Sequence, residues 1–232
     1  MIIDATSATS LVTAELAITV GEIDLVCDSV VKTDSYGYIG CVTTSNYSFY
    51  DIQSVGTKLG AADDSTYQST LPFSFDFYGS GYTSVYASTN GTLSFGTSVS
   101  SLGNSELPNT SYNNFVAAWW DDLDSGNDAA DGIWTYVQGS APNRKVYFQW
   151  QTEHYSTTPE KAVFQIILHE TTNQIDILFP DTVFGSATYD HGLSSTTGIQ
   201  GSTSSTDDYF IQYQYDGNPQ LTDGLSLTFH HP

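Results

Sequence analysis

The amino-acid sequence predicts an all-β fold: an antiparallel β-sandwich, jelly-roll-like, with a small N-terminal β or extended appendage. Short apolar segments alternate with polar residues and are separated by glycine, asparagine and proline turns. The 16 tyrosines and 12 phenylalanines favour strands over helices. No segment shows the 3.6-residue period of an amphipathic helix. Many short strands with this punctuation are typical of sandwiches and jelly rolls.

The first 44 residues differ from the rest of the chain. Residues 1–14 are rich in serine, threonine and alanine, as in a docking arm. Residues 15–31 alternate in a way that predicts one or two strands, and residues 36–42 predict another. We therefore predict an N-terminal arm or anchoring element at 1–44 and a β-sandwich surface domain at 45–232.

The clearest strand signal lies at residues 71–79. Phe73, Phe75 and Phe77 alternate there with polar residues, the pattern of a strand buried on one face. Residues 47–52 predict a short strand before it. The Asn90-Gly91 pair predicts a hairpin turn between residues 85–87 and 93–95.

Residues 115–120 form a continuous apolar run, which predicts a strand buried on both faces. The turns that follow predict two hairpins, 133–138 with 146–152 and 163–170 with 175–179. Later strands are predicted at 193–199, 209–215 and 225–229. The chain thus carries roughly twelve short strands.

The charge balance excludes two classes of partner. Five lysines and arginines stand against 26 aspartates and glutamates, a net charge of -21. Nucleic acid and anionic membranes would both repel such a surface. No stretch is apolar enough to span a bilayer, so we expect no membrane insertion. An acidic surface rich in hydroxyl groups suits an extracellular protein or the surface of a virion.

The two cysteines, Cys27 and Cys41, allow two interpretations: a disulfide, or two buried free thiols. No Cys/His cluster predicts a zinc site. The N-terminus lacks the basic and apolar regions of a signal peptide. Either a signal has been removed, or the protein reaches the exterior another way, such as in a virus particle released by lysis.

An acidic loop follows the apolar run and is the candidate metal site. Calcium prefers six to eight oxygen ligands, which carboxylates and backbone carbonyls can supply. The spacing does not match an EF-hand, and a solvated acidic loop is the alternative. No cofactor is expected to be required. The candidate calcium ligands are Asp121, Asp122, Asp124, Asp128 and Asp131.

Three aromatic residues near this loop are candidates for contact with a protein partner or a glycan: Trp119, Trp120 and Tyr155. Adjacent residues on a strand face opposite sides, so we expect one tryptophan in the core and the other at the surface. Glu153 or Glu160 could pair with a loop aspartate in a glycoside hydrolase. No motif supports that chemistry, and we predict no catalytic residues.

Several phrases together resemble a domain of bacterial extracellular and multidomain surface proteins, distantly similar to the nidogen-type extracellular domain. The resemblance covers about residues 47–200, and it implies a β-sandwich with adhesive or architectural duties and no catalytic residues. The phrases are LPFSFDFYG at 71–79, YTSVYASTNG at 82–91, AAWWDDL at 117–123, GIWTY at 132–136, APNR at 141–144, VFQIILHE at 163–170 and GIQ at 198–200.

The leading functional hypothesis is a non-enzymatic structural or interaction domain on an exterior surface. We expect a virion surface component, a decoration or fibre-type protein, docked through residues 1–44 to copies of itself or to an assembly scaffold. It would then be a homo-oligomer or part of a larger assembly. The alternatives are a secreted bacterial adhesion module and a lectin-like carbohydrate-binding module. A glycoside hydrolase ranks last.

Overall fold

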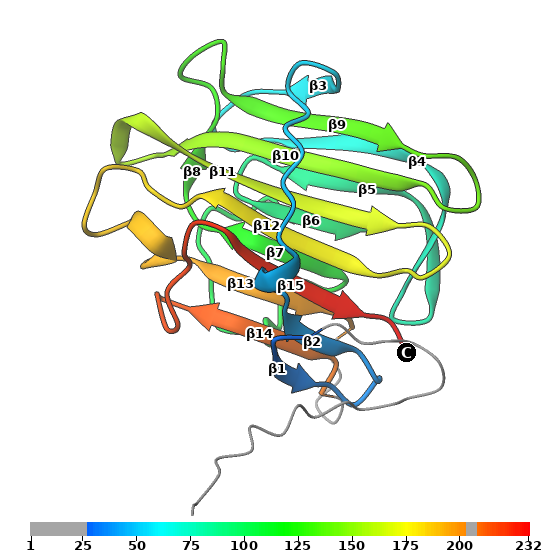
Figure 1. Ribbon diagram of the computed structural model, residues 1–232. Coiled ribbons are helices and arrows are strands. Elements are labelled where there is room, and N and C mark those ends of the chain that lie inside the picture. The colour runs from blue at the N-terminus through cyan, green and yellow to red at the C-terminus, as the bar shows by residue number, and fades with distance from the viewer. Residues whose placement is uncertain (1–26, 203–207) are drawn as a thin grey trace, which may run out of the picture.

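The computed structural model of the chain describes residues 27–202 and 208–232. Two antiparallel sheets face each other and enclose the main core (Figure 1). The all-β sandwich predicted from the sequence is confirmed, with about half of the residues in strands. Among the described residues, no helix is long and apolar enough to cross a membrane.

The larger sheet has nine strands. Its order is β1 (Ser29–Thr33), β2 (Ile39–Val42), β15 (Leu225–His230), β12 (Ile175–Asp181), β11 (Thr157–His169), β10 (Lys145–His154), β9 (Gly132–Gln138) and β3 (Thr57–Gly60). The short strand β8 (Leu123–Asp124) also pairs with β10.

The smaller sheet has six strands, in the order β14 (Phe210–Tyr215), β13 (Thr196–Gln200), β7 (Phe115–Trp120), β6 (Thr92–Phe95), β5 (Ser80–Ser88) and β4 (Thr66–Phe77). Two short 3₁₀ helices, η1 (Thr44–Asn46) and η2 (Asp190–Gly192), lie in connections.

Aromatic side chains from both sheets fill the core, as the alternating pattern of residues 71–79 predicts. Phe75 and Phe77 stack on Phe95, with ring centroids 5.6 and 4.4 Å apart. In the larger sheet, Trp150 stacks on Phe164 at 5.1 Å. The burial of these rings is the main contribution to the stability of the fold, and the preferred geometry of each aromatic pair fixes how the rings pack.

The predicted Asn90-Gly91 turn joins β5 to β6 and has a packing role as well. Gly91 has a φ of +74°, and a Cβ atom there would lie 1.8 Å from the carbonyl oxygen of Trp119. Only glycine fits this approach. The turn therefore holds the end of β7 in place, which positions the acidic region that follows.

The described part of the N-terminal region extends the larger sheet. β1 pairs with β2, and β2 pairs with β15. Cys27 and Cys41 form a disulfide with Cα atoms 5.4 Å apart, so the free-thiol interpretation is wrong. The first part of the predicted strand region at 15–31 lies outside the described residues. The domain boundary at residue 44 stays a prediction.

Residues 47–52 are not a strand, contrary to the prediction. They belong to a segment, residues 43–56, that crosses the outer face of the larger sheet, the face turned away from the core (Figure 1). We call this segment the strap. Ile52 is fully buried against Trp134, Tyr147, Ile167 and Leu178. The sequence pattern correctly indicated a buried apolar residue, but residues 50–52 bond to side chains of the sheet rather than to the backbone of a neighbouring strand.

Glutamine side chains fix the strap to the sheet. The backbone N–H of Ile52 donates to Gln149 Oε1 at 3.0 Å, and Gln149 Nε2 donates to Asp51 Oδ1 at 2.8 Å. Gln165 Nε2 donates to the carbonyl of Tyr50 at 3.0 Å. Gln149 and Gln165 are buried neighbours on β10 and β11. Buried amides need such partners, so these glutamines specify where the strap lies.

Candidate functional site

Both tryptophans at the end of β7 are fully buried, which corrects the expectation that one reaches the surface. Trp119 faces the main core and contacts Phe184, with ring centroids 5.1 Å apart. Trp120 faces the opposite side, where residues 97–112 fold over it, and its Nε1 donates to the carbonyl of Ser101 at 2.8 Å. Neither ring is placed to contact a glycan or a protein partner directly.

Tyr155, the third predicted contact residue, is exposed, with 58% of its surface accessible. Its backbone N–H donates to the carbonyl of Asp122 at 2.9 Å, so the residue lies beside the acidic region. Its role in binding stays a prediction.

The five predicted calcium ligands do not converge on one point. The structure divides them between two carboxylate clusters and leaves two outside both. Asp121 is buried and accepts a hydrogen bond from Ser194 Oγ at 2.6 Å. Asp124 accepts one from the backbone N–H of Gly126 at 2.7 Å. These two aspartates therefore hold the local backbone and side chains in place.

The first cluster joins Asp122 to Asp63 and Asp64, with carboxylate oxygens within 4.8 Å of one another. Burial, followed by repulsion from neighbouring aspartates, raises the pKa of both Asp63 and Asp122. Asn90 connects the cluster to β8, because its Nδ2 donates to Asp64 Oδ1 at 2.8 Å and its Oδ1 accepts from Leu123 N–H at 3.0 Å. This cluster could hold a divalent cation through oxygen ligands.

The second cluster joins Asp128 and Asp131 to Glu153. Asp131 is fully buried, and Lys161 Nζ lies 2.7 Å from its Oδ1. Lys161 also pairs with Asp128 and lies 4.0 Å from Glu153. Burial raises the pKa of Asp131, and the Lys161 ammonium opposes that rise. A lysine thus already supplies the positive charge at this cluster.

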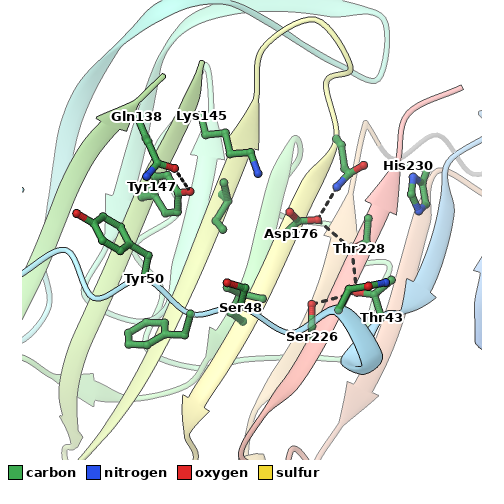
Figure 2. A pocket seen from close by; sticks show the side chains of 15 residues that line it. Thr43, Ser48, Tyr50, Gln138, Lys145, Tyr147, Asp176, Ser226, Thr228 and His230 are labelled. Carbon is green, nitrogen blue, oxygen red and sulfur yellow. Dashed lines mark hydrogen bonds between the residues drawn. The ribbon is translucent and has the colours of Figure 1, made fainter. Parts of the chain in front are cut away.

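A pocket of about 570 Å³ lies on the outer face of the larger sheet (Figure 2). The strap forms one wall through Ser48 and Tyr50, and β9, β10, β11, β12 and β15 form the floor. Ile167 and Leu178 provide an apolar centre. This volume is in the range of small-molecule sites.

Polar side chains surround that apolar centre. Tyr147 OH donates to Gln138 Oε1 at 2.8 Å, and the Thr43 hydroxyl lies 3.0 Å from the hydroxyls of Ser226 and Thr228 (Figure 2). The His230 Nε2 atom is buried without a hydrogen-bond partner among the described residues. Burial lowers the pKa of His230, which favours the neutral imidazole. The pocket therefore offers hydroxyl, amide and imidazole groups together with aromatic surface.

Asp176 is the acidic group of the pocket, and its oxygens are fully engaged. Its Oδ1 accepts from Gln174 Nε2 at 2.8 Å and from Thr228 Oγ1 at 2.9 Å, and its Oδ2 lies 2.6 Å from His169 Nε2. Burial raises the pKa of Asp176, but these hydrogen bonds and the charge of His169 lower it further, to below its ordinary value. Asp176 is thus an internally paired carboxylate.

Sequence reasoning missed the pocket and three carboxylates of the acidic clusters. Asp63 and Asp64 lie far before the acidic loop in the sequence, and Glu153 is considered above only as a hydrolase candidate. The pocket residues alternate with core residues on five strands. Their positions in the sequence therefore indicate that they face away from the core, but not that they come together in one pocket. The one available signal was the run of polar and tyrosine residues on the outward positions of these strands.

Comparison with known proteins bears out the resemblance seen in the strand phrases. A family model described as NIDO related matches residues 40–226, which include most strands of both sheets. No curated protein and no solved structure matches the chain.

Proposed function

Because the chain belongs to the NIDO-related family, we propose that it is a non-enzymatic recognition domain displayed on an exterior surface. NIDO-related domains are of an extracellular kind. The observation that carries the recognition role is the polar pocket beside the strap, in which the ammonium of Lys145 has no internal partner among the described residues. Binding sites typically combine an apolar floor with a few polar groups in this way.

The Cys27–Cys41 disulfide supports the exterior location. Disulfides persist in oxidising compartments and on cell or virion surfaces, and they are rare in reducing cytosol. The net charge of -21 also keeps such a surface soluble.

The hydrogen bonds around two histidines support a non-enzymatic role. Beside His154, Ser194 Oγ donates to Asp121 Oδ2 at 2.6 Å. Thr182 Oγ1 lies 2.9 Å from His191 Nδ1 but donates its proton to Asp223 Oδ1 at 2.7 Å. A nucleophilic hydroxyl would instead have to give its proton to a histidine acting as base. Among the described residues, these arrangements favour stabilisation of loops over catalysis.

The environment of Glu153 argues against a glycoside hydrolase. Its side chain is buried, it accepts a hydrogen bond from Asn127 Nδ2 at 2.8 Å, and it lies next to Lys161. An acid or base for glycoside hydrolysis has to reach the scissile bond of a bound sugar. Glu153 supports the packing of the acidic loop instead.

The finer form of the proposal is a virion surface component, of the decoration or fibre type, docked through its N-terminal segment. A secreted bacterial adhesion module is the alternative form. Immunogold labelling of purified virus particles and of intact producing cells separates them. Gold on particles supports the virion form, gold on cells supports the adhesion module, and labelling only after lysis, with none on particles, contradicts exterior display.

The docking role of residues 1–44 needs a deletion that spares the sheet. Cys41 is fully buried and disulfide-bonded, and β1 and β2 extend the larger sheet. Removing all 44 residues would therefore disturb the fold as well as docking. Deletion of residues 1–26 is the sharper test. Loss of incorporation into particles supports docking by the arm, and normal incorporation contradicts it.

A further inference from the structure

We infer that the pocket between the strap and the outer face of the larger sheet binds a saccharide that carries a carboxylate, such as a uronic or sialic acid. This inference rests on the proposed recognition function and specifies its ligand. The Lys145 ammonium would pair with the carboxylate, and the tyrosine, hydroxyl and amide groups would contact the sugar ring.

Lys145 is the only one of the five lysine and arginine side chains without a partner among the described residues. The sequence places all five cations within those residues. The other four are engaged: Lys32 with Asp208 at 2.6 Å, Lys58 with the carbonyl of Ala129 at 3.1 Å, Arg144 with Glu170 at 2.6 Å and Lys161 with Asp131 at 2.7 Å. In a chain of net charge -21, an unpaired cation in a pocket is available for an anionic ligand.

The nearest acidic group does not neutralise Lys145. The lysine side chain extends over the sheet in the direction of Asp176 (Figure 2), but the two form no ion pair. Asp176 already receives hydrogen bonds from Gln174 and Thr228 and pairs with His169. The positive charge of Lys145 therefore remains for a ligand.

The other lining groups favour a sugar over an apolar carboxylic acid. Tyr50 is 40% exposed and stands at the pocket wall, where its ring can pack on the apolar face of a sugar. The amide of Asn46 and the hydroxyl of Ser48 line the same wall, and His230 lies at the other end. Hydrogen-bonding groups at several sides of one pocket match a ligand with several hydroxyls.

The net charge of the whole chain favours a ligand with a single negative charge. One unpaired ammonium can balance a single carboxylate. A polyanion such as a nucleic acid would be repelled by the excess of 21 negative charges. A saccharide with a carboxylate on one ring meets both conditions.

Isothermal titration calorimetry with matched saccharides tests the inference on the 232-residue chain. The probes are sialyllactose and galacturonate, each compared with its own methyl ester, since the members of each pair then differ only in the charge of a single carboxylate. We expect the wild type to bind at least one acidic probe about tenfold or more tightly than its neutral counterpart, as a charge-assisted hydrogen bond provides. Absence of binding to all acidic probes, or equal affinity for both members of each pair, overturns the inference.

Three variants locate the interaction. Lys145→Gln should remove the preference for the acidic probe, and Tyr50→Ala should weaken binding of both members of the pair. Lys58→Gln is the matched control, because it removes one positive charge from β3 of the same sheet outside the pocket. Its affinity should equal that of the wild type. Equal losses in Lys145→Gln and Lys58→Gln would overturn the assignment of the carboxylate to Lys145.

Circular dichroism of each variant verifies that the fold is retained. The result of the saccharide titrations does not depend on the result of the immunogold labelling. If immunogold labelling establishes exterior display and the acidic probes do not bind, the saccharide inference fails and the display proposal stands.

Discussion

At the residue scale, Lys161 compensates carboxylates that the fold has removed from water. Asp131 is fully buried, and Lys161 is its ion-pair partner among the described residues. Removing one partner of a buried pair leaves an uncompensated charge. We expect Lys161→Met to lower the free energy of unfolding by about 3 kcal/mol, measured by urea denaturation.

A double variant separates loss of charge pairing from loss of packing. Adding Asp131→Asn to Lys161→Met removes the buried charge and should recover part of the lost stability. A double variant no more stable than Lys161→Met alone would contradict the assigned role of Lys161.

The Arg144–Glu170 pair makes stability depend on acidic pH. Arg144 donates to both carboxylate oxygens of Glu170, which lowers the pKa of Glu170 from 4.5 to about 2. A lowered folded-state pKa adds stability above the unfolded pKa, and this stability is lost as the pH falls from about 4.5 to about 2. Glu170→Gln should therefore reduce the free energy of unfolding at pH 7, and the reduction should be much smaller near pH 2, where Glu170 is protonated in the wild type as well.

Urea unfolding of wild type and Glu170→Gln across this pH range gives the difference. The control is Glu106→Gln, a substitution of an exposed glutamate. Its difference in free energy of unfolding from the wild type should not shrink as the pH falls. A constant gap between wild type and Glu170→Gln at every pH would show that the pair adds no pH dependence.

Calcium binding stays a prediction, and the structure gives it a sharper test. The first carboxylate cluster contains Asp122, whereas Asp124 lies in neither cluster. Calcium that binds only the folded state at about a hundredfold above its Kd adds about 2.7 kcal/mol. We expect the melting temperature to rise by several degrees in millimolar calcium, with Asp122→Asn abolishing the rise and Asp124→Asn preserving it. An unchanged wild-type melting temperature would count against calcium.

At the element scale, the strap depends on buried glutamines rather than on strand pairing. Gln149 accepts from the Ile52 N–H and donates to Asp51. Gln149→Leu leaves both groups without this partner, at a cost of about 1–3 kcal/mol. Hydrogen exchange should become faster at Ile52 and its neighbours in the strap, while β7 stays protected. Unchanged exchange across the strap would show that Ile52 packing alone holds it.

The disulfide ties the start of the described chain to β2. Cys27 and Cys41 are separated by 14 residues, and closing a loop of this size stabilises a fold by about 3 kcal/mol in the chain-entropy model. We expect the Cys27→Ser/Cys41→Ser double variant to unfold at lower urea concentration, with faster exchange concentrated in β1 and β2. A double variant as stable as the wild type in urea would show that β1 and β2 do not rely on the cross-link.

At the scale of the whole molecule, local patterns were sufficient to predict the sandwich. The alternation at residues 71–79, the turn at Asn90-Gly91 and the apolar run at 115–120 are each set by neighbours in sequence, and each matches the structure. The prediction of a strand at residues 47–52 was wrong because Ile52 has the spacing of a strand residue but packs on the outer face of the larger sheet. Periodicity alone does not distinguish a strand from an extended segment that lies across a sheet.

The candidate sites could not be predicted to the same degree because they depend on long-range convergence. Asp122 meets Asp63 and Asp64 through the Asn90 contacts, and Trp120 is hidden by a loop that folds back over it. The pocket joins Tyr50, Lys145 and His230, which are far apart in the chain. Sequence indicates which residues face outward, whereas the order of strands decides which of them meet.

The central claim is that this NIDO-related domain recognises its ligand through the outer face of the larger sheet. Amide chemical-shift mapping of isotope-labelled protein, titrated with galacturonate and sialyllactose, tests it most directly. The account predicts that shifts cluster at the strap and at the pocket ends of β10, β12 and β15, around Tyr50, Lys145 and His230. Shifts that cluster instead around Tyr155 and the acidic loop, or no shifts with either probe, would contradict it.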